Sequence, residues 1–329
     1  MVDIVCLAES RGSLTANVIF LHGLGGHPRL TWQATNDEKT LWPRWLAKDI
    51  EGHAIWSVGY EAPISRWRGR AMHLVDRAEN ILGLLLARTE FRTGRIILIG
   101  HSFGGLVIKQ LLRTLDRDAK KTAVAASLLD RIHKVAFLAT PHSGADLAVW
   151  GDWLRIVFRP SAATMCLVRN DANLRDLNSW YRDNVERIHH LVLRETIPVR
   201  ILGMIVKPDS GDPGLHRVRV WPTDTDHFSI AKPTGENHAV YTFVKNFVLE
   251  TFEPPASKID EIAETLDTVK DDTGQIRTDT GQILARMEEV NRPSQTTITF
   301  AQDAFRIEVP GSPSPLTEPE LPWQSLADA

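Results

Sequence analysis

The first 250 residues alternate between short apolar runs and longer segments with helical periodicity. The apolar runs are rich in β-branched residues and span 17–21, 54–58, 95–99, 133–138 and 200–206, with a shorter run at 217–221. Between them, apolar residues recur at helical spacing over 42–50, 70–90, 103–116 and 236–251. Alternation of this kind is typical of a mostly parallel sheet with helices on both faces. The sequence therefore predicts an α/β domain over residues 1–253, with a helical, cap-like insertion at 145–195.

A heptad pattern follows this domain. Across residues 257–292, apolar or threonine positions recur in alternating steps of three and four, which predicts an amphipathic helix with an a/d seam. The seam consists of Ile259, Ile262, Leu266, Val269, Thr273, Ile276, Thr280, Ile283, Met287 and Val290. Gly274 and Gly281 each cost about 1 kcal/mol relative to alanine in a helix. We therefore expect the helix to need support, either from a partner chain or from packing on the domain.

The end of the chain has a third composition. Residues 293–329 are rich in proline and serine, which predicts a flexible tail. Within it, the segment 297–308 has the residues for a brief strand.

Composition excludes several classes of protein. The net charge of -3 provides no broad basic field, so nucleic acid is not an expected partner. Cys6 and Cys166 are the only cysteines, which argues against a disulfide scaffold and fits a reducing cytoplasm. Residues 1–6 lack a secretory-signal pattern, and no apolar run reaches the roughly 20 residues that a membrane helix needs. We therefore expect a cytoplasmic protein.

The most informative segment is 96–107, Ile-Ile-Leu-Ile-Gly-His-Ser-Phe-Gly-Gly-Leu-Val. An apolar run ends in Gly-His-Ser-Phe-Gly and continues directly into a helical pattern, which predicts a nucleophile elbow with Ser102 at its tip. Side chains at Gly100 and Gly104 would collide with the neighbouring strand and helix. Because Gly-x-Ser-x-Gly alone occurs often by chance, its context has to support the interpretation.

A serine nucleophile needs a base and an acid that orients the base. On this kind of sheet the three follow along the chain as serine, acid, histidine. His227 follows the last predicted strand and precedes the final helix, so it is the predicted base. The acid is expected after the 200–206 run, where Asp209 is preferred and Asp212 and Asp224 are alternatives.

The remaining parts of such a site are backbone donors and lining residues. The His-Gly-Leu-Gly-Gly loop at 22–26 follows the first predicted strand, so the N–H groups of Leu24 and Phe103 are predicted to form an oxyanion hole. Four further residues are expected to line the site or brace its loops: His22, Gly23, His101 and His142. No cluster has metal-ligand spacing and no phosphate- or dinucleotide-binding pattern is present, so we expect neither a metal nor a cofactor.

Four motifs together resemble a known family. They read V-I-F-L-H-G-L-G-G at 18–26, L-I-G-H-S-F-G-G-L-V-I at 98–108, F-L-A-T-P-H-S-G at 137–144 and T-D-H-F-S-I-A-K-P at 225–233. They are similar to the serine-active-site-containing and GPI-inositol-deacylase-like esterases, which recur at the N-terminus of NACHT-type proteins. The resemblance implies an α/β-hydrolase fold and a triad in which relatives tend to have glutamate as the acid. It also implies a lipid or phospholipid ester substrate. No family motif extends past about residue 253, and no NACHT domain is present.

These observations lead to three hypotheses. The first is a serine esterase or lipase that cleaves carboxylic esters through an acyl-enzyme, with a small ester or thioester still open as substrate. The second is an adaptor whose catalytic residues are vestigial and whose 257–290 helix recruits partners. The third is an esterase whose activity depends on self-association or a partner protein bound through that helix. Transient contact with a membrane surface is compatible with a lipid substrate, but the sequence encodes no stable anchor.

Overall fold

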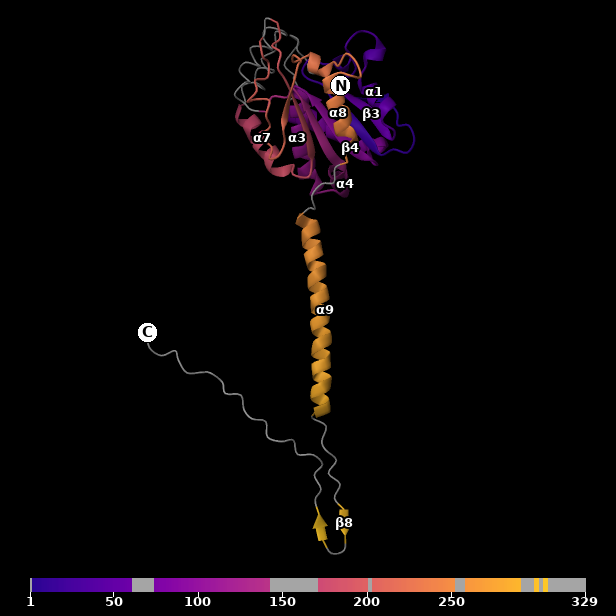
Figure 1. Ribbon diagram of the computed structural model, residues 1–329, viewed down its shortest axis with the longest axis vertical. Helices are drawn as coiled ribbons and strands as arrows, with labels where there is room; N and C mark the ends of the chain where they lie inside the picture. Colours follow the sequence, from indigo (N-terminus) through magenta and orange to yellow (C-terminus); the bar gives the residue numbers. More distant parts are fainter. Residues whose placement is uncertain are drawn as a thin grey trace, which may run out of the picture. The chain divides into compact units, whose positions relative to one another are not determined.

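The computed structural model describes residues 2–60, 74–142, 171–200, 203–251, 258–290, 299–301 and 304–306. The chain divides into two compact units, Met1–Pro255 and Ala256–Ala329. Figure 1 labels their main helices and strands.

A seven-stranded sheet forms the centre of the larger unit. Its strands are β1 (Asp3–Ala8), β2 (Ala16–Leu21), β3 (His53–Gly59), β4 (Arg95–His101), β5 (Ile132–Leu138), β6 (His189–Glu195) and β7 (Val220–Thr223). Their order across the sheet is β1-β3-β2-β4-β5-β6-β7. Only β1 pairs antiparallel with its neighbour, and the other pairs are parallel. The predicted, mostly parallel α/β arrangement is therefore confirmed.

Helices cover both faces of the sheet (Figure 1). One face packs against α2 (Leu74–Ala87), α3 (Phe103–Ala119), α4 (Ala123–Arg131) and α7 (Asp171–Asn184), and the other against α1 (Pro43–Asp49) and α8 (Ala239–Leu249). Each face of the sheet has its own apolar core, and strand β2 contributes to both. All six of its residues are buried: Ile19 and Leu21 lie in the core beside α2 and α3, and Val18 and Phe20 lie in the core beside α1 and α8. A strand buried on both faces reads as the continuous apolar run seen in the sequence.

The structure corrects the sequence prediction at one strand. The described part of the run at 200–206, residues 200 and 203–206, does not form a strand of the sheet; Gly203 makes an isolated bridge with Val199. The strand next to β5 is instead β6, at the end of the segment predicted as a helical insertion. Of that insertion, α7 is helical as predicted, and residues 145–170 lie outside the described residues. Strand β1 and helix α4 were not predicted.

The second unit contains a long helix, α9 (Lys258–Val290), within the range of the heptad pattern. Two short strands, β8 (Thr299–Ala301) and β9 (Ala304–Arg306), pair antiparallel within the segment predicted as a brief strand. The rest of the proline-rich segment lies outside the described residues. Across the part of the chain that the structure describes, no helix is both long and apolar enough to cross a membrane.

Candidate active site

Ser102 lies at a sharp turn between β4 and α3. Its backbone has φ 53° and ψ -123°, a left-handed conformation that non-glycine residues rarely adopt. Its N–H donates to the carbonyl of Leu138 (2.9 Å), which ties the turn to the end of β5. The strained turn lies at the carboxyl edge of the sheet, as expected for a nucleophile elbow.

Glycine is required next to this turn because the backbones lie very close. A Cβ on Gly104 would lie 2.1 Å from the carbonyl oxygen of Leu21 on β2, and one on Gly100 would lie 2.7 Å from the backbone nitrogen of Gly105 on α3. The predicted collisions with a strand and a helix are therefore confirmed. The elbow can form only where both positions lack a side chain.

His227 meets Ser102 from a loop after β7. Its Nε2 lies 2.9 Å from the Oγ of Ser102, and its side chain is buried. This loop joins β7 to the short helix Ser229–Ala231. The structure thus brings together the predicted nucleophile and base, which are 125 residues apart in the sequence.

The carboxylate beside His227 belongs to Glu195, not to the predicted Asp209. Glu195 Oε2 lies 2.6 Å from His227 Nδ1, and the glutamate side chain is fully buried. Asp209, Asp212 and Asp224 are all exposed. Glu195 is the last residue of β6, so the carboxylate beside His227 comes from the end of a different strand from the one predicted.

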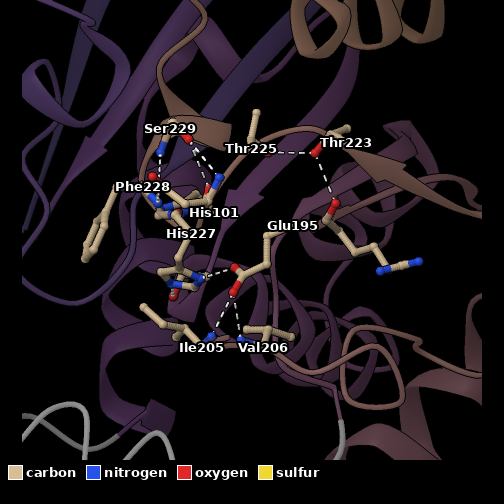
Figure 2. A network of polar contacts seen from close by, with 12 residues as sticks. His101, Glu195, Ile205, Val206, Thr223, Thr225, His227, Phe228 and Ser229 are labelled. Carbon is tan, nitrogen blue, oxygen red and sulfur yellow. Dashed lines mark hydrogen bonds and ion pairs between the residues drawn. The ribbon is translucent and has the colours of Figure 1, made fainter. Parts of the chain in front are cut away.

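Two backbone groups fix the other oxygen of Glu195. The N–H groups of Ile205 and Val206 donate to its Oε1 at 2.9 and 3.0 Å (Figure 2). An ionised carboxylate can only accept hydrogen bonds. With the carboxylate as acceptor, His227 Nδ1–H donates to Oε2 across the 2.6 Å contact, which leaves Nε2 able to accept the Ser102 hydroxyl proton. The apolar run at 203–206 thus supplies donors rather than a strand.

Further contacts hold the histidine loop in place (Figure 2). The Nε2–H of His101 donates to the backbone carbonyl of His227 (2.8 Å). Asp226 Oδ1 accepts from the N–H groups of Phe228 and Ser229 (2.8 and 2.9 Å), and Asp226 N–H donates to Ser229 Oγ (2.9 Å). Together these contacts fix the main chain on both sides of His227.

The two histidines next to the glycine loop and the elbow are held neutral. Burial lowers the pKa of His101 to about 3, and the nearby His227 and His22 contribute to the shift. Burial likewise lowers the pKa of His22 to about 4. His22 Nδ1–H donates to the carbonyl of Gly23 (2.8 Å), and its ring stacks on Tyr60 at 4.2 Å. These two histidines therefore brace the site as uncharged groups at neutral pH.

A pocket of about 240 Å³ opens at Ser102 and His227. Gly23, Leu24 and His101 line it, as predicted, together with Leu30, Phe228, Ala231 and Lys232. A Cβ on Gly23 would lie 3.0 Å from the Cβ of Ser102, so the glycine loop passes directly over the serine. The other two predicted lining residues do not line this pocket. The ring of His22 stacks on Tyr60. His142 is buried, its ring contacts Phe137, and its backbone N–H donates to the carbonyl of Ser210 (2.6 Å).

Sequence reasoning also missed Lys232, which the pocket places in the site. Its position in the T-D-H-F-S-I-A-K-P motif, five residues after His227, was the available signal. As for metals, no group of three or more His, Cys, Asp or Glu side chains within the described segments is arranged to hold an ion.

Curated proteins are similar to this chain in sequence, and solved structures are similar to it in fold. Protein SERAC1 from Mus musculus and from Homo sapiens are each 28% identical to it, over 72% of this chain. The match spans 39% of the length of each relative. Among solved structures, the Bacillus licheniformis lipase BlEst2 superposes with a TM-score of 0.52 at 16% identity, covering 76% of this chain and 98% of that one. Phospholipase PlaB from Legionella pneumophila gives 0.53 at 12% identity, covering 90% and 68%.

A family match defines this likeness more closely. Residues 18–249 match the alpha/beta hydrolase family, and they contain the elbow, the histidine loop and the glutamate at the end of β6. With the sheet order and the geometry around Ser102, the match assigns the chain: it belongs to the alpha/beta hydrolase family.

Proposed function

We propose that the protein is a serine carboxylic-ester hydrolase with Ser102 as nucleophile, His227 as general base and acid, and Glu195 as the acid that orients the histidine. The observation that carries the proposal is the continuous chain of contacts from Ser102 Oγ through His227 to Glu195, at 2.9 and 2.6 Å. Both distances are within reach for proton transfer in the ground state. The proposed acid replaces Asp209.

The reaction follows from the protonation states. His227 Nε2 accepts the hydroxyl proton as Ser102 Oγ attacks the ester carbonyl, and buried Glu195 stabilises the imidazolium that forms. The tetrahedral intermediate collapses, His227 donates the proton to the departing alcohol, and the acyl group remains on Ser102. A water molecule then repeats the sequence and releases the acid.

Two backbone N–H groups are proposed to bind the oxyanion. Leu24 belongs to the glycine loop that passes over Ser102 and lines the same pocket, and Phe103 is the first residue of α3. Because both donors belong to backbone that is fixed before the reaction, they stabilise the developing charge without reorganisation.

The lining of the pocket supports a lipid ester as substrate. Leu30 and Phe228 are exposed apolar side chains at this pocket, where an acyl chain could pack. Lys232 adds a cationic group to the same lining, which suits the phosphate of a phospholipid. The lipase BlEst2 and the phospholipase PlaB share the fold and are compatible with this substrate class.

The test is hydrolysis of a p-nitrophenyl ester series from acetate to palmitate by the wild type and by Ser102→Ala. We expect turnover that rises with acyl length and is lost in Ser102→Ala. Ser127→Ala, which changes an exposed serine on α4, is the matched control and should hydrolyse like the wild type. If no ester is turned over, the adaptor hypothesis is favoured instead.

We also propose that the chain self-associates through α9. Val269, Ile276 and Ile283 recur every seven residues on this helix and are each more than half exposed. An exposed apolar seam at heptad spacing is typical of a helix that pairs with another helix.

A further inference from the structure

The described side chains of α9 define a regular seam. In the heptad frame, Val269, Ile276 and Ile283 occupy d positions and Met287 an a position, with exposed fractions of 52 to 65%. Gly274 and Gly281 fall at b, outside the seam, and a Cβ on either would meet nothing within 4 Å. The two glycines therefore weaken the isolated helix without leaving holes in the seam.

The threonines in the seam have their polar groups satisfied. Thr273 and Thr280 occupy a positions, and their hydroxyls donate to the carbonyls of Val269 (2.7 Å) and Ile276 (2.8 Å) one turn earlier. Each threonine can therefore present its methyl group to a neighbouring helix without burying an unpaired donor.

We propose that α9 forms a parallel coiled coil of three or four copies of this chain. The inference rests on the self-association proposed above and specifies its orientation and number of chains. It does not depend on the hydrolase chemistry.

The number of chains follows from the residues at d. All five d positions are β-branched: Ile262, Val269, Ile276, Ile283 and Val290. Two-stranded coiled coils favour leucine at d, whereas β-branched residues there favour three or four strands. Leu284, at an e position, is 57% exposed and widens the apolar face beside Ile283. A wider face is buried more completely when each helix has two neighbours instead of one.

The orientation follows from the charges beside the seam. The e flank carries Lys270 and Arg277, and the g flank carries Asp272, Asp279 and Arg286. In a parallel assembly in register, the g residue of one helix faces the next e residue of its neighbour, so Asp272 meets Arg277 of a second copy. An antiparallel assembly places e against e and g against g, which opposes the cations of the e flank, Lys270 and Arg277, to those of a second copy. The charge pattern therefore favours the parallel arrangement.

The first test is sedimentation equilibrium of the full chain. We expect a mass three or four times the 36.9 kDa of one chain. A monomer would overturn both self-association and this inference, whereas a dimer would overturn only the number of chains. Labelling with a fluorophosphonate on the same samples reports on the hydrolase separately, so failure of one proposal does not obscure the other.

Charge reversals test the orientation. Asp272→Arg and Arg277→Asp should each raise the concentration at which the assembly dissociates by about 10- to 100-fold, since every neighbouring pair of helices loses an attraction and gains a repulsion. A double variant that carries both Asp272→Arg and Arg277→Asp should recover assembly, because the two reversed charges again attract each other between every pair of neighbouring helices. Asp271→Arg, at the outer f position, is the matched control and should assemble like the wild type. If Asp272→Arg does not weaken assembly, or the double variant fails to recover it, the parallel register is wrong.

Discussion

Glu195 Oε2 lies 2.6 Å from Nδ1 of His227, and its other oxygen accepts two backbone N–H groups from Ile205 and Val206. One oxygen of the carboxylate therefore contacts the histidine, and the other is held in place by two backbone N–H groups. This arrangement sets the tautomer of His227 and aims its Nε2 at Ser102. The predictions below test this geometry and its surroundings.

The identity of the acid is tested by comparing two variants. Glu195→Gln should lower kcat by about 10² to 10⁴, because an amide cannot stabilise the imidazolium and favours the wrong histidine tautomer. Asp209→Asn should hydrolyse p-nitrophenyl esters like the wild type, since Asp209 is exposed. Equal loss in both variants, or a loss in Asp209→Asn alone, would contradict the assignment.

Two glycine substitutions test the close approach at the elbow. Gly104→Ala should destabilise the protein by about 3 kcal/mol, because its Cβ would lie 2.1 Å from the Leu21 carbonyl oxygen. Gly83→Ala, on the exposed side of α2 with nothing within 4 Å, should stabilise it by about 0.5 to 1 kcal/mol. Urea unfolding measures both. A stable Gly104→Ala protein would show that the elbow can open without loss.

The free energy of unfolding should fall in acid because the pKa of buried histidines such as His101 is lowered in the folded protein. Its pKa is about 3 in the folded protein, against an ordinary value of 6.5. Between these values the unfolded chain binds the proton more tightly, so this contribution is complete above pH 6.5 and is lost as the pH falls towards 3. His101→Gln keeps a donor for the His227 carbonyl but cannot titrate. Its loss of unfolding free energy from pH 7 to pH 5 should be about 2 kcal/mol smaller than that of the wild type. Equal losses would show that His101 does not contribute.

Lys232 is expected to affect the KM of anionic substrates and not the turnover of neutral ones. Lys232→Met should raise KM for an anionic phospholipid about fivefold to tenfold, because Lys232 lines the same pocket as Ser102. Turnover of a neutral p-nitrophenyl ester should stay unchanged. Lys39→Met, an exposed lysine outside the pocket, controls for net charge. Matched losses on both substrate types would indicate a structural role for Lys232.

Much of the fold could be predicted because central strands such as β2 are buried on both faces of the sheet. The run at 17–21 lies within β2, and all residues of that strand are buried. Such a strand appears in the sequence as a continuous apolar run, which is easy to recognise. The elbow and the histidine loop were found because each is a local motif beside such a strand. The heptad pattern was equally local, since one helix carries the whole repeat.

Glu195 could not be predicted, because its place depends on the sheet. β6 reads His-His-Leu-Val-Leu-Arg-Glu, with polar residues at both ends, and the nearby 200–206 run is more apolar. Pairing with β5 and β7 selects the less apolar segment, and the chain then returns so that Ile205 and Val206 face the carboxylate. Such a return depends on contacts that no local pattern encodes.

The most direct test of the central claim is to identify the residue that a fluorophosphonate modifies in the wild-type protein. We expect a single adduct on Ser102, found by peptide mass spectrometry, and none on Ser102→Ala. An adduct on another serine, or no adduct on the folded wild type, would contradict the assignment of Ser102 as the nucleophile.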